Sequence, residues 1–274
     1  MQNFRLLYFL LMWSALLSCT SANDDSVLAV EVLKPQLLLP SDVVAYRTLA
    51  RGSGVVIESG NTSNGLTGYL MLTAAHVVTD QVNDKKGLYS PQHYPKGTTF
   101  EVCVKKQWYR AELKGISKYG DIACLVFLCD QEIPLTCLAS KRALNSEGLL
   151  LNGYTNGLDQ HEITGKCLGE AEYPLKSVAP NCDTFFGLKE SLVGGLSGGA
   201  IFDKEGNVTG IVSSMSGVDP GVGAYTHVGE IRRFLSAAWD GKYDQQPQPL
   251  RVQLSDRAVP RELGDEPKEP TVSE

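Results

Sequence analysis

A serine lies between two pairs of glycines in the segment 193–203, which reads VGGLSGGAIFD. Glycine has no Cβ, so this segment can turn sharply and bring its backbone N–H groups close to a bound carbonyl oxygen. Such a turn would expose the hydroxyl of Ser197 at its apex. A serine hydroxyl is a poor nucleophile at neutral pH, so a catalytic role also requires a histidine base and a group that orients the histidine.

Two apolar runs upstream of the serine supply both partners. Residues 69–78 (YLMLTAAHVV) form a strand-like run that contains His76, and residues 119–128 (YGDIACLVFL) place Asp121 before a second run. His76 would take the proton of Ser197 and return it to the leaving amine. Asp121 would accept a hydrogen bond from the other ring nitrogen, fix the tautomer and stabilise the imidazolium.

These three segments follow one another in the order of a known family. TAAH, DIAC and GLSGG resemble the signatures of the chymotrypsin-like (trypsin-like) serine peptidases, over about residues 46–239. The resemblance implies an all-β fold of two six-stranded antiparallel β-barrels with a C-terminal helix. It also implies a protein or peptide substrate, no cofactor and no metal. The N–H groups of Gly195 and Ser197 would form the oxyanion hole.

The GLSGG segment also fits G-x-S-x-G, the nucleophile elbow of α/β-hydrolases, which requires a helix after the serine. Here residues 200–202 are apolar, residues 203–207 (DKEGN) favour a turn, and residues 208–213 resemble a second strand. The pattern is therefore typical of a β-hairpin. The elbow also expects its acid and histidine after the serine, so His76 and Asp121 favour the peptidase interpretation.

Short apolar runs separated by Gly, Asn and Pro turns indicate two barrels, over about residues 46–135 and 145–228. The site would then lie in the cleft between them. Residues 229–239 have apolar side chains at helical spacing and predict a closing helix. Residues 23–45 are interpreted as a leader segment. The polar, Pro-rich stretch 240–274 is predicted to be disordered.

The amino-terminal residues 1–22 have the layout of a signal peptide, with a basic residue, an apolar segment and small residues. The apolar segment 6–17 is too short to span a bilayer. We therefore expect a secreted or periplasmic protein without a membrane span. Residues 16–19 also resemble a bacterial lipobox, which leaves open a lipid anchor at Cys19.

If the protein is exported, the number of its cysteines bears on whether it forms disulfides. Six cysteines remain after removal of the signal peptide: Cys103, Cys124, Cys129, Cys137, Cys167 and Cys182. An even number in an oxidising compartment favours disulfides, although buried free thiols remain an alternative. The predicted pairs are Cys167 with Cys182 and Cys129 with Cys137. No pair has the CxxC spacing of a zinc or redox site.

The charge balance argues against a nucleic-acid partner. The net charge is −6 and the pI is about 5.3, and no basic cluster is longer than Lys105–Lys106. We expect a monomer that acts on proteins or peptides.

The resemblance also assigns a primary specificity pocket. Its floor would be Ser191, followed by Leu192, and its walls would be Met215 and Gly223. Neither Ser191 nor Leu192 offers a negative charge to a buried Lys or Arg, so we expect cleavage after small to medium apolar residues. The residue before the serine is Leu196, where zymogen-activated relatives have an aspartate, so activation by a buried ion pair with a new amino terminus is not expected.

These observations predict an exported serine endopeptidase with a Ser-His-Asp triad. Two alternatives from other classes remain. One is a non-catalytic binding protein with the same fold, and the other is an esterase that uses the same triad.

Overall fold

The computed structural model describes most of the chain between residues 24 and 262. The described residues are 24–38, 43–62, 65–83, 89–92, 97–117, 120–145, 147–155, 159–171, 182–187, 192–216, 219–239 and 261–262. The predicted signal peptide (1–22) with Cys19, and most of the predicted tail (240–274), lie outside these residues.

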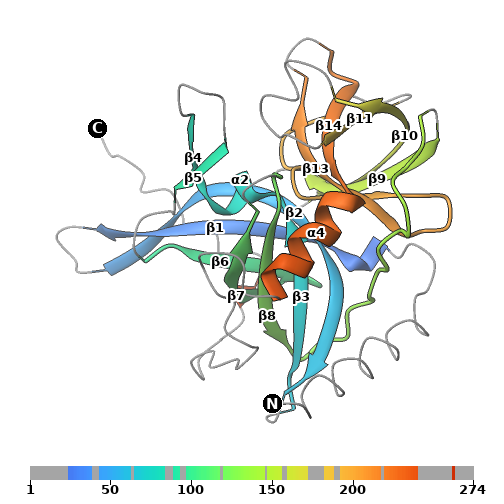
Figure 1. Ribbon diagram of the computed structural model, residues 1–274. Helices are drawn as coiled ribbons and strands as arrows, with labels where there is room; N and C mark the ends of the chain where they lie inside the picture. The colour runs from blue at the N-terminus through green and yellow to red at the C-terminus, as the bar shows by residue number, and fades with distance from the viewer. Residues whose placement is uncertain are drawn as a thin grey trace.

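The first barrel consists of six antiparallel strands. They are β1 (Val27–Leu38), β2 (Val43–Asn61), β3 (Thr67–Thr73), β6 (Thr99–Val104), β7 (Gln107–Ile116) and β8 (Ala123–Cys129). Their order is β7-β6-β1-β2-β3-β8, and the additional pairing of β7 with β8 closes the ring. Figure 1 shows that β1 and β2 continue beyond this barrel as a long hairpin.

The second barrel also has six antiparallel strands. They are β9 (Gly148–Thr155), β10 (Asp159–Glu170), β11 (Cys182–Gly187), β12 (Ala200–Phe202), β13 (Val208–Met215) and β14 (Val222–His227). The ring closes in the order β10-β11-β14-β13-β12-β9. The prediction of two six-stranded antiparallel barrels is therefore confirmed, and the hairpin predicted after the serine is formed by β12 and β13.

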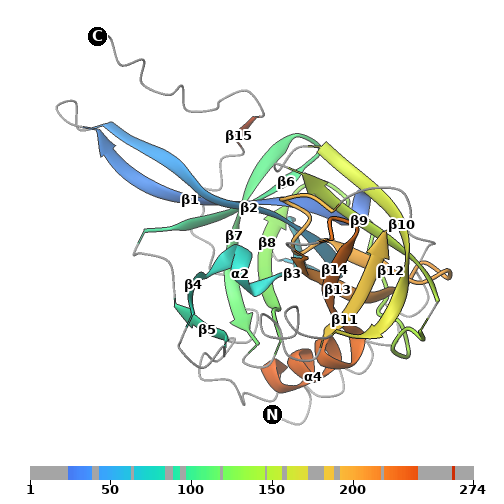
Figure 2. The ribbon, with the colours of Figure 1, turned by 90° about the horizontal axis from the view of Figure 1, so that it is seen from above.

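The remaining elements are short. They are η1 (Asp24–Ser26), α2 (Ala75–Val78), β4 (Asp80–Asn83), β5 (Tyr89–Gln92), α4 (Val228–Trp239) and β15 (Arg261–Glu262). Strands β4 and β5 form a two-stranded sheet that lies near α2 in both views (Figures 1 and 2). β15 pairs with β7, so the predicted disordered tail contributes one short strand. Among the described residues, no helix has the length and apolar character needed to cross a membrane.

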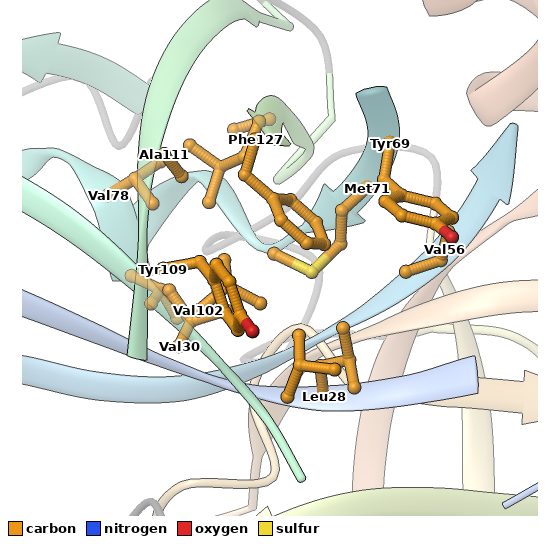
Figure 3. Close-up of a cluster of buried hydrophobic side chains, with 14 of the residues drawn as sticks. Leu28, Val30, Val56, Tyr69, Met71, Val78, Val102, Tyr109, Ala111 and Phe127 are labelled. Atoms are coloured by element: carbon orange, nitrogen blue, oxygen red, sulfur yellow. The ribbon is translucent and has the colours of Figure 1, made fainter. Parts of the chain in front are cut away.

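Strand β8 is buried along its whole length, and its two faces enter two different cores. Leu125 and Phe127 lie in the core of the first barrel, part of which Figure 3 shows. Cys124 and Val126 alternate with them and lie in a second cluster. Successive side chains of a strand point to opposite faces, so a strand that is covered on both sides is apolar throughout and does not alternate apolar with polar residues. This explains the unbroken apolar run after Asp121.

The second cluster joins both barrels and helix α4. Its buried members are Val27, Val55, Leu70, Leu72, Ile122, Cys124 and Val126 from the first barrel, Ala200, Phe202, Val208 and Ile211 from the second, and Ile231 and Phe234 from α4. Phe234 reaches the first barrel, because a Cβ on Gly115 of β7 would stand 3.4 Å from its Cζ. The helix that follows the second barrel therefore packs against the first and stabilises their relative position.

The segment 23–45, interpreted above as a leader, contains β1 and the start of β2. β1 pairs with β2 on one side and with β6 on the other, and Val27 and Val30 are fully buried. Without β1 the ring would be open, so the predicted start of the first barrel at residue 46 is wrong. Both faces of β1 are covered, because Val30 lies in the barrel core and Val27 lies in the cluster between the barrels. The strand therefore lacks the alternation of apolar and polar residues by which a strand is recognised in a sequence.

Both predicted disulfides are wrong, because Cys129, Cys167 and Cys182 carry free thiols. Cys129 is therefore not bonded to Cys137. Cys167 lies opposite Phe185 in the β10–β11 register, and Cys182 is three residues further along β11. That offset is roughly 10 Å, and a disulfide needs Cα atoms about 4.4–6.8 Å apart. Burial raises the pKa of Cys182 to about 12, so its thiol stays protonated at neutral pH.

The position of Phe234 predicts a large loss of stability on truncation. Phe234→Ala should lower the free energy of unfolding by about 3–5 kcal/mol, because it leaves a cavity where α4 meets both barrels. Urea unfolding followed by tryptophan fluorescence measures this. Leu144→Ala, at a side chain that is 64% exposed, is the control and should change stability by less than about 0.5 kcal/mol. Equal effects of the two variants would contradict the packing role of α4.

Candidate active site

His76 lies on α2, the single helical turn that follows β3. At the end of β3 the Thr73 hydroxyl donates a hydrogen bond to the carbonyl oxygen of Ser53, at 2.6 Å. At the other end of α2 the Thr79 hydroxyl donates to the carbonyl oxygen of Ala75, at 2.7 Å. These bonds hold the turn at both ends, and the His76 side chain remains 23% exposed. A base that must meet substrate needs this partial exposure.

Asp121 lies in the turn before β8 and is 1% exposed. Its Oδ2 is 2.6 Å from Nδ1 of His76, and its Oδ1 accepts a hydrogen bond from the backbone N of His76 at 2.9 Å. The hydroxyl of Ser213, on β13, donates to Oδ2 at 2.7 Å. A buried carboxylate is costly unless such donors surround it. Because Ser213 belongs to the second barrel, the third of these hydrogen bonds forms only when the two barrels meet.

The two ionisable groups stabilise each other's charged form. Burial alone would lower the pKa of His76, but the charge and hydrogen bond of Asp121 raise it above its usual value. Burial alone would raise the pKa of Asp121, but the charge of His76 and the hydrogen bonds from His76 and Ser213 hold it below its usual value. Asp121 therefore stays ionised at neutral pH and keeps the Nδ1 proton on the ring.

Ser197 lies beside α2. Its carbonyl oxygen accepts a hydrogen bond from the backbone N of Ser53, at 2.8 Å. A Cβ on Gly52 would stand 2.6 Å from Cγ2 of Val77 and 2.9 Å from the carbonyl oxygen of Ser197, so these three residues meet. Because Val77 directly follows His76, the backbone of Ser197 lies close to the helical turn that carries the histidine.

The glycines around Ser197 are required by the backbone. Gly195 has φ of +97° and Gly198 has φ of +86°, a region that residues with a Cβ rarely adopt. A Cβ on Gly198 would also collide with the carbonyl oxygen of Ser53 and stand 2.9 Å from the N of Ala74. Only glycine therefore lets the serine loop approach the segment that carries the histidine.

Within residues 193–199, two amides have a backbone acceptor among the described residues. The N–H groups of Gly198 and Gly199 donate to backbone carbonyl oxygens at 2.8 and 2.9 Å. The N–H groups of Gly195 and Ser197 meet no protein acceptor among the described residues. The same holds for Val193, Gly194 and Leu196, so the two residues assigned to the oxyanion hole from the sequence belong to a longer run of amides without a protein acceptor there.

The residue before Ser197 anchors the loop in the core of the second barrel. Leu196 is fully buried, and it packs with Leu192, Val212 and Tyr225. An aspartate could not occupy this position without a buried cationic partner. The apolar anchor is therefore consistent with the expected lack of an ion-pair switch.

Three of the four predicted pocket residues come together, and Ser191 lies outside the described residues. Leu192 is buried, and its Cδ1 lies 2.5 Å from the point where a Cβ on Gly223 would stand. Met215 pairs with Gly223 in the β13–β14 register, and its side chain is 40% exposed. The side chain of Leu192 therefore fills the space above Gly223.

Two serines at this site were not recognised in the sequence. Ser213 entered the sequence analysis only as the last residue of the strand-like run 208–213, and Ser53 did not enter it. Both are buried, and their hydroxyls bond to Asp121 and to the serine loop, respectively. Ser53 stands between two glycines, and Ser213 stands between a valine and a serine, so the local sequence gives no signal of either role. No group of three or more His, Cys, Asp or Glu among the described residues is arranged to hold a metal ion.

Comparisons with known proteins agree with this geometry. Residues 52–211 match the family described as trypsin-like peptidase domain. The fold is similar to the active form of the Rv3671c protease of M. tuberculosis, with a TM-score of 0.53 and 18% identity, over 78% of this chain and 80% of that chain. An inactive serine-to-alanine mutant of that protein gives a TM-score of 0.53 and 19% identity, over 80% of this chain and 89% of that chain. A search of curated proteins found no match.

The contact between His76 and Asp121 predicts a measurable coupling. Asp121→Asn should lower the pKa of His76, because it removes the carboxylate charge that raises this pKa and leaves the effect of burial. NMR titration of the His76 ring proton measures the change. Asp203→Asn, in the turn between β12 and β13, is the control and should leave the His76 pKa unaltered. An unchanged pKa in Asp121→Asn would contradict the pairing.

Proposed function

This chain belongs to the trypsin-like peptidase domain family, a family of serine proteases, and from that premise we propose that it is an exported serine endopeptidase that uses Ser197, His76 and Asp121 as its catalytic triad. The observation that carries the proposal is the contact between the buried Asp121 and Nδ1 of His76, beside the loop of Ser197. The family and the two-barrel fold that were predicted from the three sequence segments are confirmed, and they support this proposal.

The geometry supports the following steps. Ser197 Oγ attacks the carbonyl carbon of the scissile bond while Nε2 of His76 takes its proton. Asp121 holds the Nδ1 proton and stabilises the imidazolium. The negative charge on the substrate oxygen meets the N–H groups of Gly195 and Ser197, where one such donor is typically worth about 10²- to 10³-fold in rate. His76 then protonates the leaving amine, and water releases the acyl group from Ser197 by the same steps in reverse.

The protonation state of His76 sets the pH dependence. The ring acts as a base only when it is neutral, so activity rises as the pH passes through its pKa. Asp121 raises this pKa above its usual value, so the rise occurs at a higher pH than for an isolated histidine. The raised pKa of His76 also contributes to the free energy of unfolding. This contribution is fully present below the pKa of His76 in the unfolded chain, and it is lost as the pH rises through the higher pKa of His76 in the folded protein.

Substitution of the triad tests the proposed chemistry. Ser197→Ala and His76→Ala should each lower kcat by about 10⁶-fold, because triad members act as a unit. Asp121→Asn should cost about 10⁴-fold through the wrong tautomer. Hydrolysis of a chromogenic peptide measures the rates, and a fluorophosphonate probe reports the serine nucleophile. Ser59→Ala, at an exposed serine of β2, is the matched control and should keep full activity and labelling.

Each other outcome identifies an alternative. Peptidase activity above about a per cent in purified Ser197→Ala would contradict the assignment of the nucleophile. No labelling of wild-type protein would favour a binding protein with this fold. Labelling with turnover of esters but not of peptides would favour an esterase.

The packing of Leu192 supports a specificity for small apolar residues. The Leu192 side chain occupies the space over Gly223, which makes the pocket shallow. The described part of the pocket, Leu192, Met215 and Gly223, offers no carboxylate to a buried Lys or Arg, which would be costly without one. Cleavage after Ala or Val fits this space best, and Leu or Met fit less well.

Shortening of Leu192 should therefore enlarge the pocket. Leu192→Ala should favour substrates with Leu, Met or Phe at the cleaved position. The ratio of kcat/KM for such a substrate to kcat/KM for the matching Ala substrate should rise by about 10- to 100-fold. A peptide library read by mass spectrometry measures the shift. Leu144→Ala is the control and should leave the preference unchanged. Dominant cleavage after Lys or Arg by the wild type would mean that another side chain, such as Glu190, lines the floor.

Export is proposed on the layout of residues 1–22. Amino-terminal sequencing of the protein recovered from the periplasm or the medium tests it. We expect a new terminus at Asn23, or at a lipidated Cys19 if the lipobox is used. Recovery of the intact chain from the cytoplasm alone would contradict export.

A further inference from the structure

Ser53, on β2 of the first barrel, is fully buried and directs its polar groups to the serine loop of the second barrel. Its backbone N donates to the carbonyl oxygen of Ser197 at 2.8 Å. Its hydroxyl donates to the carbonyl oxygen of Gly195 at 2.9 Å. One residue therefore holds the carbonyl groups of both residues whose N–H groups are assigned to the oxyanion hole.

The direction of the Ser53 hydroxyl proton is fixed by Tyr154 on β9. The backbone N of Tyr154 donates to Oγ of Ser53 at 2.7 Å. The carbonyl oxygen of Tyr154 lies further away, at 3.4 Å. A hydroxyl has one proton, and with its lone pair facing the Tyr154 N–H, that proton goes to the nearer acceptor, the carbonyl oxygen of Gly195.

The backbone at Gly195 needs such a support. Gly194 and Gly195 are successive glycines, and Gly195 has φ of +97°. A Cβ on Gly194 would meet no atom within 4 Å, so packing does not restrict it. Peptide groups between glycines rotate at little steric cost, and a rotation here would turn the Gly195 N–H away from the substrate oxygen. The bond from Ser53 fixes the carbonyl of Gly195, which belongs to the next peptide group, and so holds one of the two ends between which the peptide group with the Gly195 N–H can rotate.

We propose that Ser53 is a positioning residue for catalysis, which holds the Gly195–Ser197 backbone with its two N–H groups towards the substrate oxygen. The inference rests on the proposed function and extends it. The hydrogen bonds of Ser53 go to Gly195, Ser197 and Tyr154, and among the described residues none joins it to His76. Its loss should therefore affect the stabilisation of the transition state and leave both substrate affinity and the pKa of His76 unchanged.

Ser53→Ala tests the proposal in the full-length protein. We expect kcat to fall by about 10- to 100-fold, less than the 10²- to 10³-fold typical for a donor that is removed, because both N–H groups remain but are less well held. KM should stay the same. Affinity for a peptide aldehyde, whose hemiacetal oxygen occupies the oxyanion hole, should fall by a factor similar to that of kcat. The midpoint of the pH–rate profile should not move.

Ser26→Ala is the matched control, because Ser26 is also a fully buried serine and its Oγ accepts a hydrogen bond from the Thr136 hydroxyl at 2.7 Å. It should leave kcat and aldehyde affinity unchanged. If Ser53→Ala does not fold, Ser53→Cys keeps a group of similar size with a weaker donor and should show the same selective loss of kcat.

The failure of this inference can be told from failure of the proposed function. An active wild type with Ser197-dependent turnover, together with a folded Ser53→Ala variant of unchanged kcat and aldehyde affinity, would overturn the role of Ser53 alone. A loss of kcat that merely follows the fraction of unfolded protein, with aldehyde affinity per folded molecule intact, would also overturn it. Absence of Ser197-dependent turnover in the wild type would instead contradict the proposed function.

Discussion

The carboxylate of Asp121 is the constraint on which the arrangement of this protein depends. It is 1% exposed, and a buried charge without donors would be costly. Its donors come from His76 in the first barrel and from Ser213 in the second. The full set of three hydrogen bonds therefore forms only when both barrels are folded and correctly placed, which couples the ionised state of Asp121 to the fold.

Apolar packing and close backbone contacts provide that placement. The cluster shared by both barrels and α4 fixes their distance through Phe202 and Phe234, among others. Nearer to the site, Gly52 and Gly198 allow the backbones of the two barrels to approach more closely than any side chain would permit. Ser53 then adds directional bonds at the same contact. Together these contacts hold the two barrels against each other, and Figures 1 and 2 show the barrels side by side.

The incorrect predictions have a common cause. Strand β1 was interpreted as a leader because it is covered on both faces, and its residues Val27 and Val30 serve different cores. The disulfides were predicted from an even cysteine count, but Cys167 and Cys182 lie at different levels of neighbouring strands. In both cases the deciding fact is which residues lie opposite each other on paired strands, and composition carries no information on it.

The sequence by itself determined the fold class, the family and the candidate residues His76, Asp121 and Ser197. It could do so because each lies in a local pattern, a histidine or aspartate beside an apolar strand or a serine among glycines, and local patterns depend on backbone sterics and strand periodicity. Only the tertiary structure decided the roles of Ser213 and Ser53, the position of Leu192 over Gly223, and the membership of β1 in the first barrel. The sequence around a serine on a buried strand does not show whether its hydroxyl has a partner. The hydrogen bonds of Ser53 and Ser213 cross the contact between the two barrels, and that contact exists only after both barrels have folded.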